Sequence, residues 1–171
     1  MAAQTHCFET GPALKLKLVT VGKTKLRHWQ TAEADFVQRI ERYAQVQQVV
    51  VKDASRQAFR NGKLVKETEA KALAQRLYPD DFVVALHPTG MQMSSEAFAR
   101  FFREKTLHGR SRFAFVIGGP LGLDRKILNH ADFVLSLSDM TFPHELAKVI
   151  LLEQIYRAMT ILKGEKSHRG C

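Results

Sequence analysis

Short apolar runs alternate along the chain with longer segments in which apolar residues recur at helical spacing. The apolar runs occupy residues 14–21, 46–52, 82–86, 113–117 and 133–137. Runs of this length, rich in β-branched and aromatic residues, are typical of buried strands. The helical patterns occupy residues 29–43, 63–77, 94–107 and 144–162. This alternation of four to five strands with helices predicts an α/β fold, a mostly parallel sheet flanked by helices.

Local signals predict where some of these elements end. Ser94 is suited to cap the helix that follows it, and Pro79 stands just beyond the end of the preceding helix. The third strand is expected to end at Leu86, with a turn at residues 87–90. His87 is a lone histidine in that turn, and we assign it no chemistry.

Two loops follow the fourth and fifth predicted strands, at the edge where open α/β sheets bind ligands. The first is residues 118–122, Gly-Gly-Pro-Leu-Gly. Gly118 and Gly119 are expected to adopt backbone angles closed to other residues and to let a ligand approach the main chain. An ordinary strand-to-helix turn remains the alternative. Neither G-x-G-x-x-G nor G-x-x-x-x-G-K-S/T is present, so this is not a recognisable phosphate-binding loop.

The second loop, residues 138–143, combines hydroxyls with apolar surface. Thr141 is expected to cap the final helix, with Pro143 in its first turn. Ser138 offers a second hydroxyl, and Met140 and Phe142 offer apolar area. This mixture suits a flat, uncharged heteroaromatic ring, and the alternative is a capped helix with nothing bound.

The charge balance favours a polyanionic partner. Lysine and arginine number 26 against 17 acidic residues, which gives a net charge of +9 and a pI near 9.8. Such a balance is typical of RNA-binding proteins. Lys23, Lys25 and Arg27 follow the first strand and are candidates for phosphate contacts, unless they only line a solvated loop. We interpret residues 53–62 as a mobile basic loop.

Aromatic and apolar residues suggest packing roles. Trp29 is expected to anchor its helix to the sheet, and the phenylalanines of the helix at 94–107 are expected in the core. The final helix, residues 144–162, is apolar over more than one face. Because such a helix needs burial on two sides, we predict a homodimer.

Other classes of protein fit the chain less well. Residues 1–13 have neither the basic start nor the apolar core of a secretory signal, and we interpret them as a flexible N-terminal extension. No apolar run approaches the roughly 20 residues of a membrane span. Cys7 and Cys171 form neither a disulfide framework nor a metal-binding pattern, which fits a reducing cytosol. No G-x-S-x-G, H-E-x-x-H or cysteine–base pattern occurs, which is unfavourable to a hydrolase and compatible with methyl transfer.

Several motifs, in order, resemble one known family. They are I-G-G-P-L-G-L at 117–123, L-S-L-S-D-M-T-F-P-H-E-L-A-K at 135–148 with E-Q-I-Y-R-A at 153–158, and a terminal His168-Arg169. The resemblance extends to residues 16–23 and 83–99, and it covers nearly all the chain after residue 13. The sequence is similar to the SPOUT-class methyltransferases that N3-methylate a pseudouridine in large-subunit ribosomal RNA.

This resemblance implies a single SPOUT domain at residues 14–171, with a trefoil knot and a homodimeric assembly. It implies S-adenosylmethionine as cofactor and the large-subunit rRNA, in assembled ribosomes, as partner, with no membrane and no metal. The implied cofactor-binding residues are Leu86, Gly118, Gly119, Leu137, Ser138, Asp139, Met140, Thr141 and Phe142. The implied catalytic residues are Arg157, His168 and Arg169.

One position departs from the family's pattern. Relatives have a tyrosine directly before the tail histidine, whereas this chain has Ser167. A serine cannot stack on a base, so either another ring compensates or the activity differs. Two alternatives therefore stay open, a non-catalytic basic ribosome-binding factor and a SPOUT methyltransferase acting on tRNA.

Overall fold

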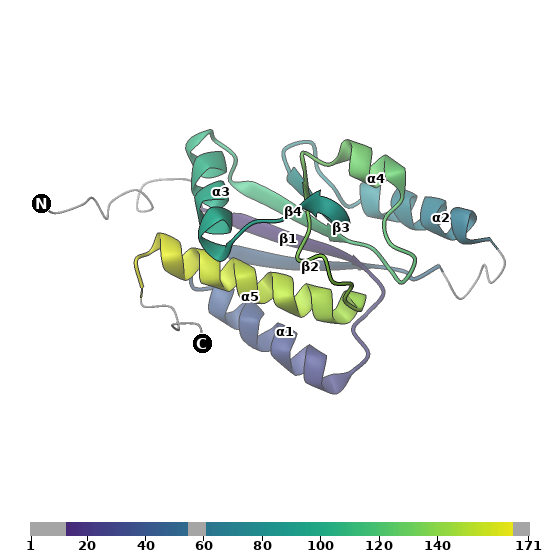
Figure 1. The fold of residues 1–171 in the computed structure, drawn as a ribbon, viewed down its shortest axis with the longest axis horizontal. Helices are drawn as coiled ribbons and strands as arrows, with labels where there is room; N and C mark the ends of the chain where they lie inside the picture. Colours follow the sequence, from purple (N-terminus) through teal and green to yellow (C-terminus); the bar gives the residue numbers. More distant parts are fainter. Residues whose placement is uncertain (1–12, 55–60, 166–171) are drawn as a thin grey trace, which may run out of the picture.

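The computed structural model describes residues 13–54 and 61–165, and their centre is a five-stranded sheet (Figure 1). The strands are β1 (Lys15–Val21), β2 (Gln45–Val51), β3 (Phe82–Met91), β4 (Arg112–Ile117) and β5 (Phe133–Leu135). Their order is β2-β1-β4-β3-β5, and every pairing is parallel. The predicted α/β fold with a mostly parallel sheet is therefore confirmed.

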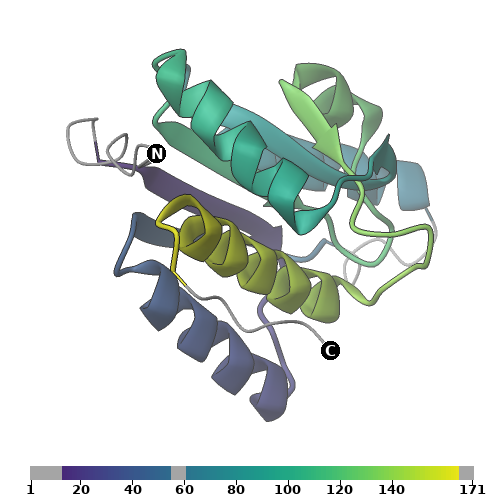
Figure 2. The ribbon, with the colours of Figure 1, turned by 60° about the vertical axis from the view of Figure 1, so that its left-hand side comes forward.

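Helices cover both faces of the sheet. They are α1 (Arg27–Ile40), α2 (Gly62–Ala74), α3 (Ser95–Leu107), α4 (Arg125–His130) and α5 (His144–Leu162). Helices α1, α3 and α5 lie side by side on one face, with α2 and α4 on the other (Figure 2). Alternate residues of β4 belong to the hydrophobic cores on the two faces of the sheet. Phe113 and Phe115 are in the core under α3 and α5, and Val116 is in the core under α2 and α4.

The short helix α4 was missed by the hydrophobic pattern. It has six residues, which is too few for a helical period to show. Its start is nevertheless defined, because the side chain of Asp124 accepts a hydrogen bond from the backbone N–H of Lys126 at 2.8 Å. The same kind of cap was predicted correctly at α3, where the Ser94 hydroxyl accepts from the backbone N–H of Ala97 at 3.2 Å.

Several predicted boundaries were wrong. Helix α1 begins and ends earlier than expected, α2 ends at Ala74 rather than at residue 77, and β5 ends at Leu135 rather than at residue 137. Strand β3 continues to Met91, although its regular pairing stops at Leu86: both residues face Leu135 of β5 across a register shift. Gly90 permits this irregularity, because a Cβ there would stand 2.6 Å from the backbone carbon of Leu135.

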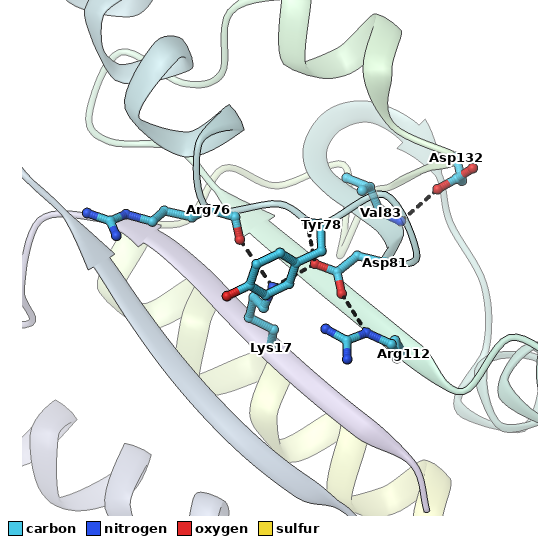
Figure 3. Close-up of polar contacts among 7 residues, drawn as sticks. All are labelled: Lys17, Arg76, Tyr78, Asp81, Val83, Arg112 and Asp132. Carbon is cyan, nitrogen blue, oxygen red and sulfur yellow. Dashed lines mark hydrogen bonds and ion pairs between the residues drawn. The ribbon is translucent and has the colours of Figure 1, made fainter. Parts of the chain in front are cut away.

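A polar cluster closes the amino edge of the sheet (Figure 3). The Lys17 ammonium contacts the Asp81 carboxylate at 2.7 Å and stands 3.6 Å from the centre of the Tyr78 ring. Arg112 contacts the same carboxylate at 3.3 Å, and the backbone N–H of Tyr78 donates to it at 2.9 Å. Burial alone would raise the pKa of Asp81, but these hydrogen bonds and the Lys17 charge lower it. These contacts join elements of the fold at the amino edge of the sheet, and the candidate functional site lies at the opposite, carboxyl edge.

Candidate active site

A cavity of about 580 Å³ opens at the carboxyl edge of the sheet, where the second half of β3 and the loops after β4 and β5 meet the start of α5. That volume is within the range of small-molecule pockets. Its lining residues are Leu86, His87, Pro88, Ile117, Gly118, Gly119, Pro120, Gly122, Leu135, Ser136, Leu137, Ser138, Met140, Thr141, Phe142, Pro143, His144 and Ala147.

The cavity brings together most of the residues that the resemblance implied. Of the nine implied cofactor-binding residues, Asp139 alone is not in the lining; its carboxylate instead accepts a hydrogen bond from the Gln92 side chain at 2.5 Å. Sequence reasoning missed His144 and Ala147, which follow the second loop directly. It assigned no role to His87, which lies in the second half of β3 and also lines the cavity.

The glycine loop has a different physical basis from the one expected. Neither Gly118 nor Gly119 has a positive φ, whereas Gly122 has φ +76°. Position 118 requires glycine because two parts of the loop approach each other closely there: a Cβ on residue 118 would stand 2.7 Å from the backbone carbon of Gly122. At Gly119 a Cβ would stand 3.0 Å from Cγ1 of Val21, on the strand beside β4. The two glycines let the loop fold tightly against its own chain and against β1.

The second loop is organised by its serines. The Ser136 hydroxyl donates to the carbonyl oxygen of Ser138 at 3.0 Å, and the Ser138 hydroxyl accepts from the backbone N–H of Met140 at 3.0 Å. The expectation that Thr141 caps the final helix was wrong. The helix begins after Pro143, with no side-chain cap, and Thr141 instead lines the cavity.

The cavity wall carries little charge. Among the described residues that line it, the titratable side chains are those of His87 and His144, and the rest of the lining is apolar, hydroxyl or backbone. Met140 is 73% exposed and stands at the mouth. Such a wall can hold an uncharged ring by apolar contact and backbone hydrogen bonds.

Arg157, the one implied catalytic residue within the described part of the chain, does not line this cavity. Arg157 lies 13 residues after His144 on α5, about 20 Å further along the helix axis. Its Nε donates to the Glu153 carboxylate at 2.9 Å. His168, Arg169 and the departing Ser167 lie outside the described residues.

The connection between β1 and α1 is fastened beside the cavity. The Glu145 carboxylate accepts from the backbone N–H groups of Lys25 and Leu26, at 3.1 and 3.5 Å. One turn along α5, the buried Lys148 ammonium contacts the Glu33 carboxylate of α1 at 2.7 Å, and the Thr24 hydroxyl donates to the same carboxylate. The basic connection is therefore held against the end of α5 that lines the cavity.

Trp29 does not have the packing role that we expected. Its side chain is partly exposed, and it is not among the described residues that pack against either core cluster. Its ring instead meets the exposed His28 ring edge-on, with 4.6 Å between the centroids. Phe36 and Val37 are among the α1 residues that pack on the core instead.

Comparison with known proteins identifies the family. The family model described as predicted SPOUT methyltransferase matches residues 14–168. This chain belongs to the SPOUT methyltransferase family. A probable methyltransferase from Bordetella pertussis has a similar fold, with a TM-score of 0.54 at 11% identity over 85% of this chain and 95% of that one.

Two relatives in this family are similar along their whole length. Proteins named ribosomal RNA large subunit methyltransferase H, from Carboxydothermus hydrogenoformans and Bifidobacterium adolescentis, are 41% and 42% identical to this chain. Each alignment covers 91% of this chain and all of the relative. Within residues 13–54 and 61–165, no helix is long and apolar enough to cross a membrane, and no group of side chains could hold a metal ion.

Proposed function

We propose that this protein transfers a methyl group from S-adenosylmethionine to N3 of a pseudouridine in large-subunit ribosomal RNA. The observation that carries the proposal is the full-length similarity, at 41% and 42% identity, to proteins named ribosomal RNA large subunit methyltransferase H. The positive net charge and the cavity at the carboxyl edge support it independently. The same similarity favours this function over a non-catalytic ribosome-binding factor or a tRNA methyltransferase.

The cavity suits the cofactor proposed for it. S-adenosylmethionine, when bound, supplies the electrophilic methyl group. Leu86, Leu137 and Phe142 offer apolar contact to an adenine ring, and the backbone of residues 118–119 and 137–142 offers hydrogen bonds. The lining that the described residues form has no carboxylate or ammonium group, which suits a ring that is neutral at pH 7. The chain thus provides binding and orientation, which is the main protein contribution in cofactor chemistry.

We propose that the active site is completed by a second subunit. Helix α5 runs about 27 Å from His144, at the cavity, to Leu162. The six residues from there to His168 span at most about 22 Å when fully extended. A tail that starts at the far end of α5 is therefore poorly placed to serve the cavity of its own chain. In the proposed homodimer, the tail and Arg157 of one subunit would serve the other subunit's cavity.

The proposed roles follow from the charge that the reaction creates. The pseudouridine N3 must lose its proton for a methyl group to bond there, which leaves negative charge on the base during transfer. Arg157 and Arg169 would orient the base or its phosphate and stabilise that charge. A neutral His168 imidazole would contact the nucleoside and accept the proton.

The test is methyl transfer from labelled S-adenosylmethionine to ribosomes that lack the modification, followed by nucleoside analysis of the rRNA. We expect 3-methylpseudouridine. Cofactor binding without transfer to ribosomes would contradict the substrate and direct attention to tRNA. Ribosome binding with neither transfer nor cofactor binding would support the non-catalytic factor.

A further inference from the structure

An exposed aromatic and basic patch lies at the start of α1. We call it the α1 patch, and it consists of Lys23, Lys25, Leu26, Arg27, His28 and Trp29. Leu26 is 52% exposed, and Trp29 is partly exposed with the His28 ring against it. Exposed apolar surface in this amount has no explanation in the packing of the described chain, since the core under α1 is made by residues further along the helix.

The cations of the α1 patch are not neutralised. Within the described ranges, no carboxylate forms an ion pair with Lys23, Lys25 or Arg27. Two carboxylates that contact this connection interact with other groups. Glu33 is buried against Lys148, and Glu145 accepts backbone N–H groups of the connection itself. The patch therefore presents three cations beside an aromatic ring, and no carboxylate of the described residues forms an ion pair with them.

The position of the patch is fixed relative to the cavity. Glu145, which holds the backbone of Lys25 and Leu26, lies between His144 and Ala147, and both of these line the cavity. The contact between Lys148 and Glu33 ties the next turn of the two helices together at 2.7 Å. A polymer bound at the patch would therefore enter the cavity region without leaving the protein surface.

We propose that the α1 patch binds the rRNA strand beside the target nucleotide, with Trp29 stacking on an unpaired base and Lys23, Lys25 and Arg27 contacting phosphates. Single-stranded nucleic acid is bound in general by aromatic stacking combined with basic side chains. A second copy of this chain fits the patch less well, because a two-fold contact would bring like charges together. This inference rests on the proposed methylation of ribosomal RNA and specifies the surface that recognises it.

The first test compares Trp29→Ala and Trp29→Phe with the wild type, using ribosomes that lack the modification. Loss of one stacked base predicts a KM for ribosomes raised by about fivefold or more in Trp29→Ala, and a smaller increase in Trp29→Phe. The dissociation constant of S-adenosylmethionine should not change, because Trp29 does not line the cavity. Arg103→Ala, which removes an exposed cation of α3, is the control and should leave KM unchanged.

The second test measures the contribution of the basic side chains separately from that of Trp29. Removing one phosphate contact in Lys25→Ala should make the negative slope of log(kcat/KM) against log salt shallower by about 0.7, whereas Arg103→Ala should leave the slope unchanged. Because Trp29 is the chain's only tryptophan, its fluorescence gives a third reading. A uridine dodecamer should quench it, and high salt should reverse the quenching.

The outcomes separate this inference from the proposed function. Methylation by the wild type with an unchanged KM in Trp29→Ala overturns the α1 patch and leaves the methyltransferase in place. Trp29→Ala that becomes monomeric in light scattering shows that the patch is a subunit contact and overturns the inference as well. If Trp29→Ala does not fold, the salt slope of Lys25→Ala decides. No methylation by the wild type overturns the proposed function, and the quenching experiment then decides the patch alone.

Discussion

Ala147 is a small residue in the wall of the cavity. Substituting it can test cofactor binding separately from folding. It lies in the second turn of α5 and lines the cavity. Enlarging it to phenylalanine in Ala147→Phe fills space that the ligand needs, so we expect the dissociation constant of S-adenosylmethionine to rise at least about tenfold. Isothermal titration measures this.

Ala34→Phe is the matched control, because Ala34 is exposed on α1. Both variants should unfold within a few degrees of the wild type. Unchanged cofactor affinity in Ala147→Phe would place the cofactor somewhere other than this cavity. Gly119→Val is a less clean probe, because its side chain would meet Val21 behind the loop.

Asp81 should make the stability of the fold depend on pH in the acid range. Its pKa in the folded protein is lowered, so the stabilisation is fully present above its unfolded value of about 3.9 and is lost as the pH falls through the folded value. Asp81→Asn should cost about 1.5–3 kcal/mol at pH 7 and should flatten the loss of stability below about pH 4. Urea unfolding at a series of pH values measures both effects.

The exposed neighbour Asp80 provides the control for this experiment. Asp80→Asn should reproduce the stability and the pH dependence of the wild type. An equal effect of the two substitutions would show that general charge, and not the contacts with Lys17 and Arg112, controls acid stability.

At the scale of elements, the joint between α1 and α5 depends on a buried ion pair. Removing one partner in Lys148→Met leaves the Glu33 carboxylate buried without its counter-charge. We expect a loss of about 3–5 kcal/mol in the free energy of unfolding, measured by urea denaturation. The double variant Glu33→Gln/Lys148→Met should recover much of this loss.

The exposed pair between Arg39 and Asp35 provides the comparison, since both side chains are nearly half exposed. Asp35→Asn should change the free energy of unfolding by less than about 1 kcal/mol. If Lys148→Met were as mild as Asp35→Asn, the joint would be held by apolar packing alone.

The elements also show what the sequence can and cannot predict here. Five strands, four helices and the Ser94 cap were predictable because period and capping chemistry are local. Helix α4 could not be predicted, because it is too short to show a helical period. The continuation of β3 past Leu86 could not be predicted either, because it depends on how β5 pairs with β3. Trp29 was misjudged for a related reason: helical spacing shows which residues share a face, but not how far along a helix the core extends.

The candidate site, like the fold, could be predicted from the sequence only in part. The glycine and serine loops could be located from their positions after buried strands, and the motif resemblance identified eight lining residues. The structural roles of these loop residues could not be predicted, because a contact such as that between Gly118 and Gly122 exists only once the loop has folded. The start of α5 at His144 was predicted correctly, but the helical pattern alone did not show that His144 and Ala147 line the cavity.

At the scale of the whole molecule, the proposed exchange of tails can be tested by complementation. One chain carries Ala147→Phe, and the other is truncated after Gly164. If the tail serves the partner's cavity, each subunit is inactive by itself, but a mixed dimer has one intact cavity facing one intact tail. Random mixing should restore about a quarter of the wild-type methylation rate, measured with labelled cofactor after unfolding and refolding the mixture.

A mixture that stays inactive while light scattering shows mixed dimers would contradict this arrangement, since it would mean that cavity and tail must belong to one chain. The control mixes the truncated chain with a chain carrying both changes. That pair offers no intact tail and should remain inactive.

The order of strands in the sheet also affects how the chain is made. Strand β1 lies between β2 and β4 in the sheet. Strand β4 follows it by about a hundred residues, and of its two neighbours only β2 is close to it in sequence. At translation speeds of roughly 5–20 residues per second, the apolar edge of β1 waits about 5–20 s for its second neighbour. A nascent chain of this protein would thus remain incompletely folded until most of it had been synthesised, and it would depend for that time on chaperones or on the ribosome surface to avoid aggregation.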